Sequence, residues 1–159
     1  MFARAVERTG PGRFELRLSA EERRLLRELP VQLASLLAEA PDDPSLRRLF
    51  PPAYADDADA DAEYHQLMHA ELAGQHRDAL AVLAETADRD EVGAEELHAW
   101  LAALNDLRLV LGTRLGVTEE LYEQELDADD PAAAELGVYL YLTSLQEQVV
   151  EAAARDAAP

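Results

Sequence analysis

One arginine lies where the surrounding residues are almost all apolar. A helical pattern aligns five leucines on one stripe, and Arg108 falls in the middle of it. The stripe consists of Leu97, Leu101, Leu104, Leu111 and Leu115. An unpaired charge inside a core costs several kcal/mol, so we expect an internal ion pair with Glu71, Gln146 or Glu147 as the partner. The alternative is a pocket in which Arg108, with Asn105 one turn earlier, binds a carboxylate or phosphate ligand.

Two histidines have the spacing of metal ligands on one helix. His65 and His69 are four residues apart, which places both imidazoles on one face of a helix. His76 is on the same stripe, but it is nearly two turns further along and too far away to share an ion. The zinc-protease pattern is absent because no glutamate follows His65 directly. We therefore predict neither a metal site nor a cofactor, and His65 and His69 are the candidates should a metal bind.

Other kinds of reaction centre find no support in the sequence. The run Asp57-x-Asp59-x-Asp61 begins like a calcium loop, but the sixth and twelfth positions hold Ala62 and Met68 instead of glycine and glutamate. No nucleophile elbow, phosphate-binding glycine loop or dinucleotide fingerprint occurs. With 33 carboxylates in the chain, no single acid pair indicates acid–base catalysis. We predict that the protein is not an enzyme.

The charge of the chain is strongly negative and unevenly distributed. Residues 1–48 carry nine arginines and eight acids, whereas residues 49–159 carry five arginines and 25 acids, and the formal net charge is −19. Such an acidic surface repels phosphate backbones, so we expect the body of the protein not to bind nucleic acid. The chain has no cysteine, which excludes disulfides and thiolate chemistry.

The location of the protein follows from its first residues and its hydropathy. The opening MFARAVERTG is too polar for a signal peptide, and no apolar run approaches the length of a membrane span. We therefore expect a cytoplasmic protein without a membrane partner.

These polar residues are positioned by elements that the sequence predicts to be mainly α-helical. Residues 1–18 form a β-hairpin, because Phe14, Leu16 and Leu18 alternate with polar residues after a Gly-Pro-Gly turn. Ser19 and Glu22 form a capping box, and the helix they open keeps its apolar phase across Pro30, which favours one kinked helix.

The remaining helices complete a bundle of about four main helices in one domain. A connector follows the first helix, and Gly116 ends the third helix. The expected boundaries are a connector over 41–57, helices over 59–86, 94–115 and 131–155, a short helical piece over 118–125, and a flexible tail over 156–159. The helical bundle thus spans residues 19–155.

The connector holds an apolar, proline-stiffened segment. Its notable residues are Leu49, Phe50, Pro52 and Tyr54. We expect the segment to pack back over the bundle, and the alternative is a docking epitope for a protein partner whose fixed backbone lowers the entropy cost of association.

Two motifs resemble an actinobacterial family that is a domain of unknown function. They are LRRLFPPAY at 46–54 and LNDLRLVLGTRLG at 104–116. The resemblance extends over nearly the whole chain, including the opening hairpin and the closing helix at 139–150. The resemblance implies that genes of this family lie near those for the Clp protease adaptor and for a sulfur carrier with its metalloprotease partner. Some relatives carry the label of transcriptional regulator. The resemblance implies no catalytic residues.

Three functions are compatible with these observations. The leading one is a non-enzymatic adaptor linked to regulated proteolysis, with an edge of the hairpin free to accept another strand. The second is a transcription-associated regulator acting through arginines of the N-terminal part. These are Arg4, Arg8, Arg13, Arg17, Arg23, Arg24 and Arg27. The third is an anion- or metabolite-binding bundle centred on Arg108. The hairpin edge and the apolar third helix are also compatible with a homodimer.

Overall fold

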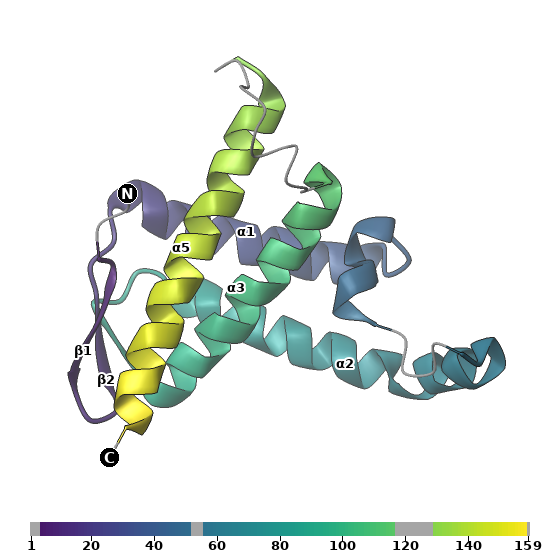
Figure 1. The fold of residues 1–159 in the computed structure, drawn as a ribbon, viewed down its shortest axis with the longest axis horizontal. Helices are drawn as coiled ribbons and strands as arrows, with labels where there is room; N and C mark the ends of the chain where they lie inside the picture. The colour runs from purple at the N-terminus through teal and green to yellow at the C-terminus, as the bar shows by residue number, and fades with distance from the viewer. Residues whose placement is uncertain (1–3, 52–55, 117–128, 159) are drawn as a thin grey trace.

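Long helices dominate the computed structural model, which describes residues 4–51, 56–116 and 129–158 (Figure 1). The long helices are α1 (Ala20–Glu39), α2 (Ala58–Thr86), α3 (Ala94–Leu115) and α5 (Pro131–Ala157). The predicted class, mainly α with an N-terminal β-hairpin, is confirmed. The helical piece expected over 118–125 lies outside the described residues. Among the described helices, none combines the length and the apolar composition that crossing a bilayer requires.

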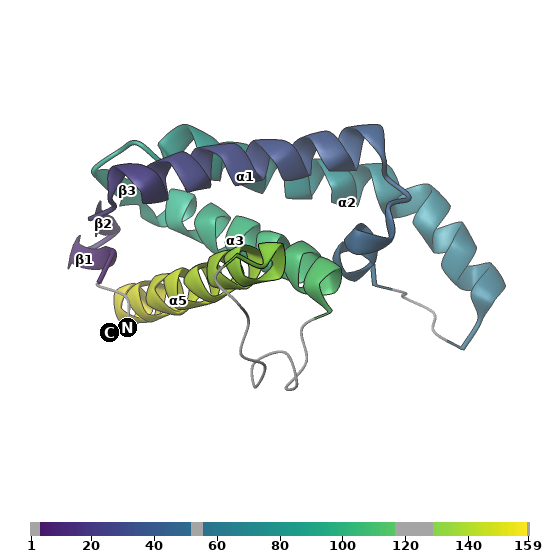
Figure 2. The ribbon, with the colours of Figure 1, turned by 90° about the horizontal axis from the view of Figure 1, so that it is seen from above.

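The helices form two layers (Figure 2). In one layer α1 lies beside α2, in the other α3 lies beside α5, and α2 packs on α3 to join them. The core lies between the layers, and Trp100 is its largest fully buried side chain. Its indole is fully buried, and the Nε1–H donates to Thr86 Oγ1 over 2.6 Å. The predicted helices therefore bury their apolar faces in one shared core.

Local signals in the sequence account for where the helices begin and end. Ser19 Oγ accepts from the backbone N–H of Glu22, and the Glu22 carboxylate accepts from the backbone N–H of Ser19, each over 3.2 Å. Pro30 is buried within α1, which continues as one helix as predicted. Gly116 ends α3 in the left-handed region at φ 60°, which glycine adopts without a Cβ clash.

The hairpin belongs to a three-stranded antiparallel sheet. Strands β1 (Val6–Gly10) and β2 (Arg13–Leu16) pair as expected. A third strand, β3 (Glu91–Gly93), pairs with the other edge of β2 and was not predicted. Three residues are too few to show the alternation by which a strand is recognised, so its pairing is a consequence of the tertiary structure.

The connector and the C-terminus are more ordered than the sequence predicted. A 3₁₀ helix, η1 (Pro44–Leu49), lies within the connector, and the Asp43 carboxylate caps it by accepting from the backbone N–H of Ser45. Helix α5 continues two residues past its expected end at 155. In that last turn Asp156 Oδ1 accepts from the Gly12 N–H and from Arg8 Nε, each over 2.8 Å. Residues 156 and 157 are therefore helical, and Asp156 joins α5 to the hairpin.

Candidate functional site

Arg108 lies at the edge of the buried face of α3 rather than in its middle. The face that enters the core consists of Leu97, Trp100, Ala103, Leu104, Leu107 and Val110. Leu101, Leu111 and Leu115 of the predicted stripe are only partly buried. The prediction chose the wrong phase because α3 is apolar on nearly all sides, so leucine spacing alone does not identify the face that Trp100 occupies.

Polar groups without charge hold the Arg108 side chain. Its Nε donates to Thr143 Oγ1 over 3.0 Å, its Nη1 donates to Gln146 Oε1, and the guanidinium lies 5.7 Å from the centre of the Tyr139 ring. Among the described residues no carboxylate lies within ion-pair distance of it, so the expected ion pair with Glu71 or Glu147 is wrong and Gln146 is the partner.

The half-buried Arg108 borders a shallow hollow on the surface. The hollow has a volume of about 320 Å³ and is lined by Thr143, Gln146, Glu147, Val150 and Glu151 as well. Asn105 is partly buried, and none of the hydrogen bonds found among the described residues links its side chain to Arg108. The structure therefore does not bring the two predicted network residues together.

The buried charge of α3 belongs to Asp106, which is 5% exposed. Its Oδ2 lies 2.7 Å from Nδ1 of His76 on α2, and Nε2 of His76 lies 3.1 Å from the backbone carbonyl oxygen of Leu49 at the end of η1. Phe50 packs its ring edge-to-face against the imidazole. One histidine therefore joins α2, α3 and the connector.

The hydrogen-bond geometry favours the protonated form of His76. A carbonyl oxygen and a carboxylate oxygen both accept, so the imidazole donates from both nitrogens when it is protonated. The hydrogen bond to Asp106 raises the pKa of His76, and the negative charge of Asp106 and the Leu49 carbonyl act in the same direction against the effect of burial. Because Nε2 is bonded to Leu49, it is not available to activate a nucleophile as a catalytic histidine would.

We expect the stability contributed by His76 to fall as the pH rises. The folded-state pKa lies above the ordinary value of 6.5, so the contribution is fully present below about pH 6.5 and is lost as the pH rises through the folded pKa. Urea unfolding of the wild type and of His76→Gln between pH 6 and 9 measures this, and the difference between the two free energies should shrink with pH.

His98 provides the matched control because it is exposed on α3. His98→Gln should change the pH dependence of stability much less than His76→Gln does. A difference between wild type and His76→Gln that is constant from pH 6 to 9 would contradict the assignment of His76 as an ion-paired group.

The two histidines considered for metal binding have other neighbours. His65 Nε2 lies 3.6 Å from Asp61 Oδ2, and the His69 ring stacks on Phe50 with 4.4 Å between ring centres. Within the described part of the chain, no three His, Asp or Glu side chains are grouped so that they could hold a metal ion. His65 thus contacts its own helix and His69 contacts the connector, and both histidines border one hollow beside η1.

The described part of the proline-stiffened segment packs on the protein itself. Leu49 is buried, and Phe50 is partly buried against the core and both neighbouring histidines. Leu49 is therefore not accessible to a partner, and Phe50 is partly covered by the protein itself. Pro52 and Tyr54, the other two proposed docking residues, lie outside the described residues.

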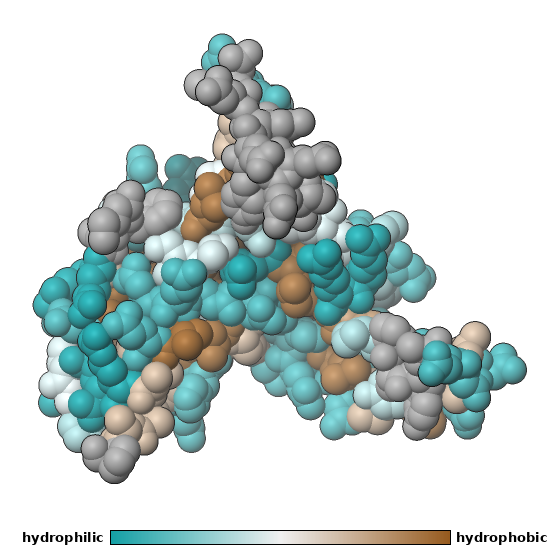
Figure 3. Space-filling view, viewed as in Figure 1, coloured by the Kyte–Doolittle hydropathy of each residue, from teal (hydrophilic) through white to brown (hydrophobic). Residues whose placement is uncertain are grey.

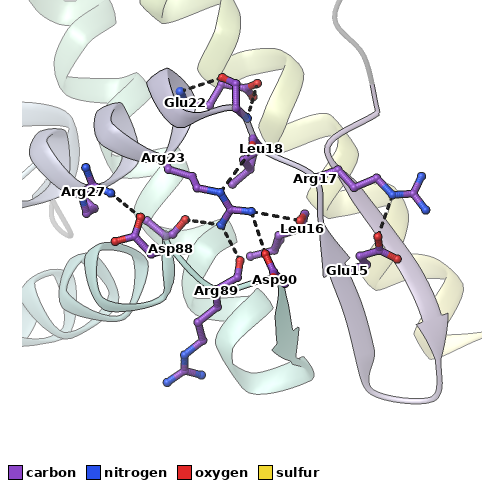
Figure 4. A network of polar contacts seen from close by, with 12 residues as sticks. Glu15, Leu16, Arg17, Leu18, Glu22, Arg23, Arg27, Asp88, Arg89 and Asp90 are labelled. Carbon is purple, nitrogen blue, oxygen red and sulfur yellow. Dashed lines mark hydrogen bonds and ion pairs between the residues drawn. The ribbon is translucent and has the colours of Figure 1, made fainter.

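Arg23 is the centre of a second polar cluster, between the end of β2, the start of α1 and the turn before β3 (Figure 4). Its guanidinium donates to four backbone carbonyl oxygens and to the Asp90 carboxylate at 2.7–3.4 Å. The carbonyls belong to Leu16, Leu18, Ala87 and Arg89. The Arg23 side chain is 17% exposed. Arg23 thus attaches the sheet to the helices.

The other N-terminal arginines are paired with carboxylates as well. The pairs are Arg4–Glu151, Arg8–Asp156, Arg13–Glu91, Arg17 with Glu7 and Glu15, Arg24–Glu28 and Arg27–Asp88. All seven arginines that a nucleic-acid interface would require therefore have carboxylate partners. These carboxylates offset the charge of seven of the nine arginines in residues 1–48.

Sequence reasoning missed the His76–Asp106 pair and the role of Arg23. A signal for the pair was present, since Asp106 is an acid inside a helix that is apolar on most sides. The spacing of the leucines indicated Arg108 as the buried charge instead. Arg23 gave no such signal, because its acceptors are backbone carbonyls 64 and 66 residues away as well as nearby ones.

Comparison with known proteins gives one family and a consistent set of relatives. Residues 3–153 match the family model described as "Domain of unknown function (DUF2017)". Proteins named "Oxidative stress regulator AosR" in Mycobacterium tuberculosis and Mycobacterium bovis are 33% identical, over 92% of this chain and 84% of theirs. A similarly named Mycobacterium leprae protein is 36% identical over 71% of this chain and 59% of its own length. No solved structure matches the chain significantly.

Proposed function

The chain belongs to the DUF2017 family, and from this we propose that it is a non-enzymatic regulator of the response to oxidative stress that acts through protein partners. The names of its mycobacterial relatives support the regulatory part of the proposal. An adaptor in regulated proteolysis is one form that such a regulator would take.

The pairing of the N-terminal arginines is the observation that favours proteins over DNA as partners. Nucleic-acid binding depends on cations that release counterions from phosphates. Here each of the seven arginines already has a carboxylate partner, and the chain carries a net charge of −19. A DNA duplex would have to displace these carboxylates and overcome the repulsion of the remaining acids.

The hydrogen bonds of His76 and Arg108 support the proposal that the protein is not an enzyme. His76 has both nitrogens engaged, and Arg108 is held by a threonine and a glutamine. The anion-binding alternative at Arg108 loses support because Thr143 and Gln146 already accept from the guanidinium, and no second cation among the described residues lines the hollow.

The absence of cysteine affects how such a regulator would receive its signal. Cysteine thiolates are oxidised reversibly by peroxide, and these 159 residues contain no cysteine. We propose that the oxidant signal reaches this protein through a partner or through its own abundance. Deletion of the gene should change survival of its host in peroxide, and the unmodified chain should restore it. Unchanged survival of the deletion strain would contradict the regulatory role.

We expect no salt-dependent shift of duplex DNA near physiological ionic strength. Electrophoretic mobility with fragments of host DNA at about 0.05 and 0.2 M salt measures this, since phosphate contacts weaken steeply across that range. A variant with Glu7→Gln, Glu15→Gln, Asp88→Asn and Glu91→Gln releases three arginines from their carboxylates, so any DNA binding should be stronger than in the wild type. A clear, salt-sensitive shift with the wild type would favour the DNA-binding alternative.

A further inference from the structure

One face of α5 points away from the core and carries an unusual combination of side chains. Leu140, Thr143, Glu147 and Val150 lie on one stripe at helical spacing, opposite the face that buries Leu142, Leu145 and Val149. Leu140 is 37% exposed and Val150 is 48% exposed. They are two of the four large hydrophobic residues that are exposed in the described part of the chain, the others being Val31 and Leu67.

Arg108 occupies the centre of this surface. Thr143 and Gln146 orient its guanidinium beside the hollow between α3 and α5, and Glu147 and Val150 line the same hollow. Figure 3 shows this side of the molecule, with apolar patches among polar residues over the two helices. Partly buried arginine flanked by tyrosine and aliphatic side chains is the composition typical of the centre of a protein interface.

The charges of this surface are complementary to those of a second copy. Arg108 has no carboxylate partner among the described residues, and Glu147 lines the same hollow without approaching it to ion-pair distance. A partly buried cation is stabilised when an approaching surface supplies a carboxylate. In a contact between two identical surfaces related by a two-fold axis, each copy supplies the group that the other lacks.

The spacing along α5 matches such a contact. If two α5 helices cross antiparallel about an axis near residue 145, residues equally far from it on either side face each other. Leu140 then lies opposite Val150 of the second copy, and Thr143, which holds Arg108, lies opposite Glu147 of the second copy. We propose that this α5 face is the interface of a symmetric homodimer, in which Arg108 of each copy pairs with Glu147 of the other.

The inference is independent of the proposed function, and the oligomeric state tests it. Sedimentation equilibrium near 0.15 M salt should give twice the 17.5 kDa chain mass, because at low salt the net charge of each copy opposes association. Arg108→Glu and Glu147→Arg should each raise the dimer dissociation constant at least about tenfold, since each places like charges across the interface. The double variant Arg108→Glu/Glu147→Arg should restore most of the affinity.

The apolar part of the interface has its own test and control. Val150→Asp should give a monomer, whereas Val31→Asp, on an equally exposed valine of α1, should remain dimeric. Circular dichroism verifies that each variant is folded, and Glu147→Arg changes only an exposed side chain. A wild-type monomer at about 0.1 mM, equal effects of Val150→Asp and Val31→Asp, or failure of the double charge reversal to restore association would each overturn the proposal.

Discussion

Replacement of Asp106 by alanine should lower the free energy of unfolding by about 3–5 kcal/mol, the usual cost of removing one member of a buried ion pair. Asp106 is 5% exposed and accepts from His76, which also donates to Leu49. Without the carboxylate, protonated His76 is left without a counterion, and neutral His76 loses one partner. Urea denaturation near pH 6, where His76 is protonated, measures the loss.

Two further variants separate the ion pair from the loss of packing. Asp106→Asn keeps an acceptor for His76 but removes the charge, so it should lose less stability than Asp106→Ala. In the double variant His76→Gln/Asp106→Asn the effects should be non-additive, because the residues are in contact. Asp78→Ala, at an exposed position on α2, should change stability by no more than about 0.5 kcal/mol. An equal, small effect of Asp106→Ala would show that the pair does not stabilise the fold.

Replacement of Arg23 by leucine should lower the free energy of unfolding by about 2–4 kcal/mol. Hydrogen bonds to a charged donor contribute about 1.5–3 kcal/mol each, and Arg23 donates to four backbone carbonyls and to Asp90. The total is smaller than the sum because water can reach part of the cluster once the side chain is gone. Thermal and urea unfolding measure the loss, and hydrogen exchange should show faster opening of β3 and the turn before it.

Arg24 is the control for Arg23 because it is the next residue on α1. It is 71% exposed and pairs with Glu28 one turn away, so Arg24→Leu should cost about 0.3–0.5 kcal/mol. Arg23→Lys keeps the charge but lacks the planar fork, and it should lose most of what Arg23→Leu loses. If Arg23→Leu and Arg24→Leu were equally mild, Arg23 would not attach the sheet to the helices.

Arg23 and Asp156 also explain how the small sheet persists in a helical protein. A hairpin of short strands is marginal alone. Here β3 extends it, Arg23 attaches β2 to α1 and to the turn before β3, and Asp156 at the end of α5 attaches the hairpin turn. The backbone hydrogen bond from Gly12 and the contact with Arg8 lower the pKa of Asp156, which therefore stays charged at neutral pH.

The sequence by itself determined the features that depend on residues close together in the chain. The capping box of Ser19 and Glu22, the glycine that ends α3, the Asp-Pro start of α5 and the alternation in the hairpin each involve neighbours within a few positions. Such interactions form between residues that are close in the chain, so they can be recognised in the sequence without knowledge of the rest of the fold. The family resemblance, carried by long continuous motifs, was readable for the same reason.

The tertiary structure alone decided which charges are buried and what they bind. Helix α3 is apolar on most sides, and only its packing against α2 and α5 determined that Trp100 and Asp106 enter the core while Arg108 stays at the edge. The partners of His76 and Arg23 come from segments tens of residues away, as does the strand that completes the sheet. Rotating a helix about its axis by about 100°, the angle between successive residues, exchanges buried and exposed positions. When a helix is apolar on most sides, the sequence pattern does not determine this rotation. Packing determines it, because only one orientation fills the space between the layers.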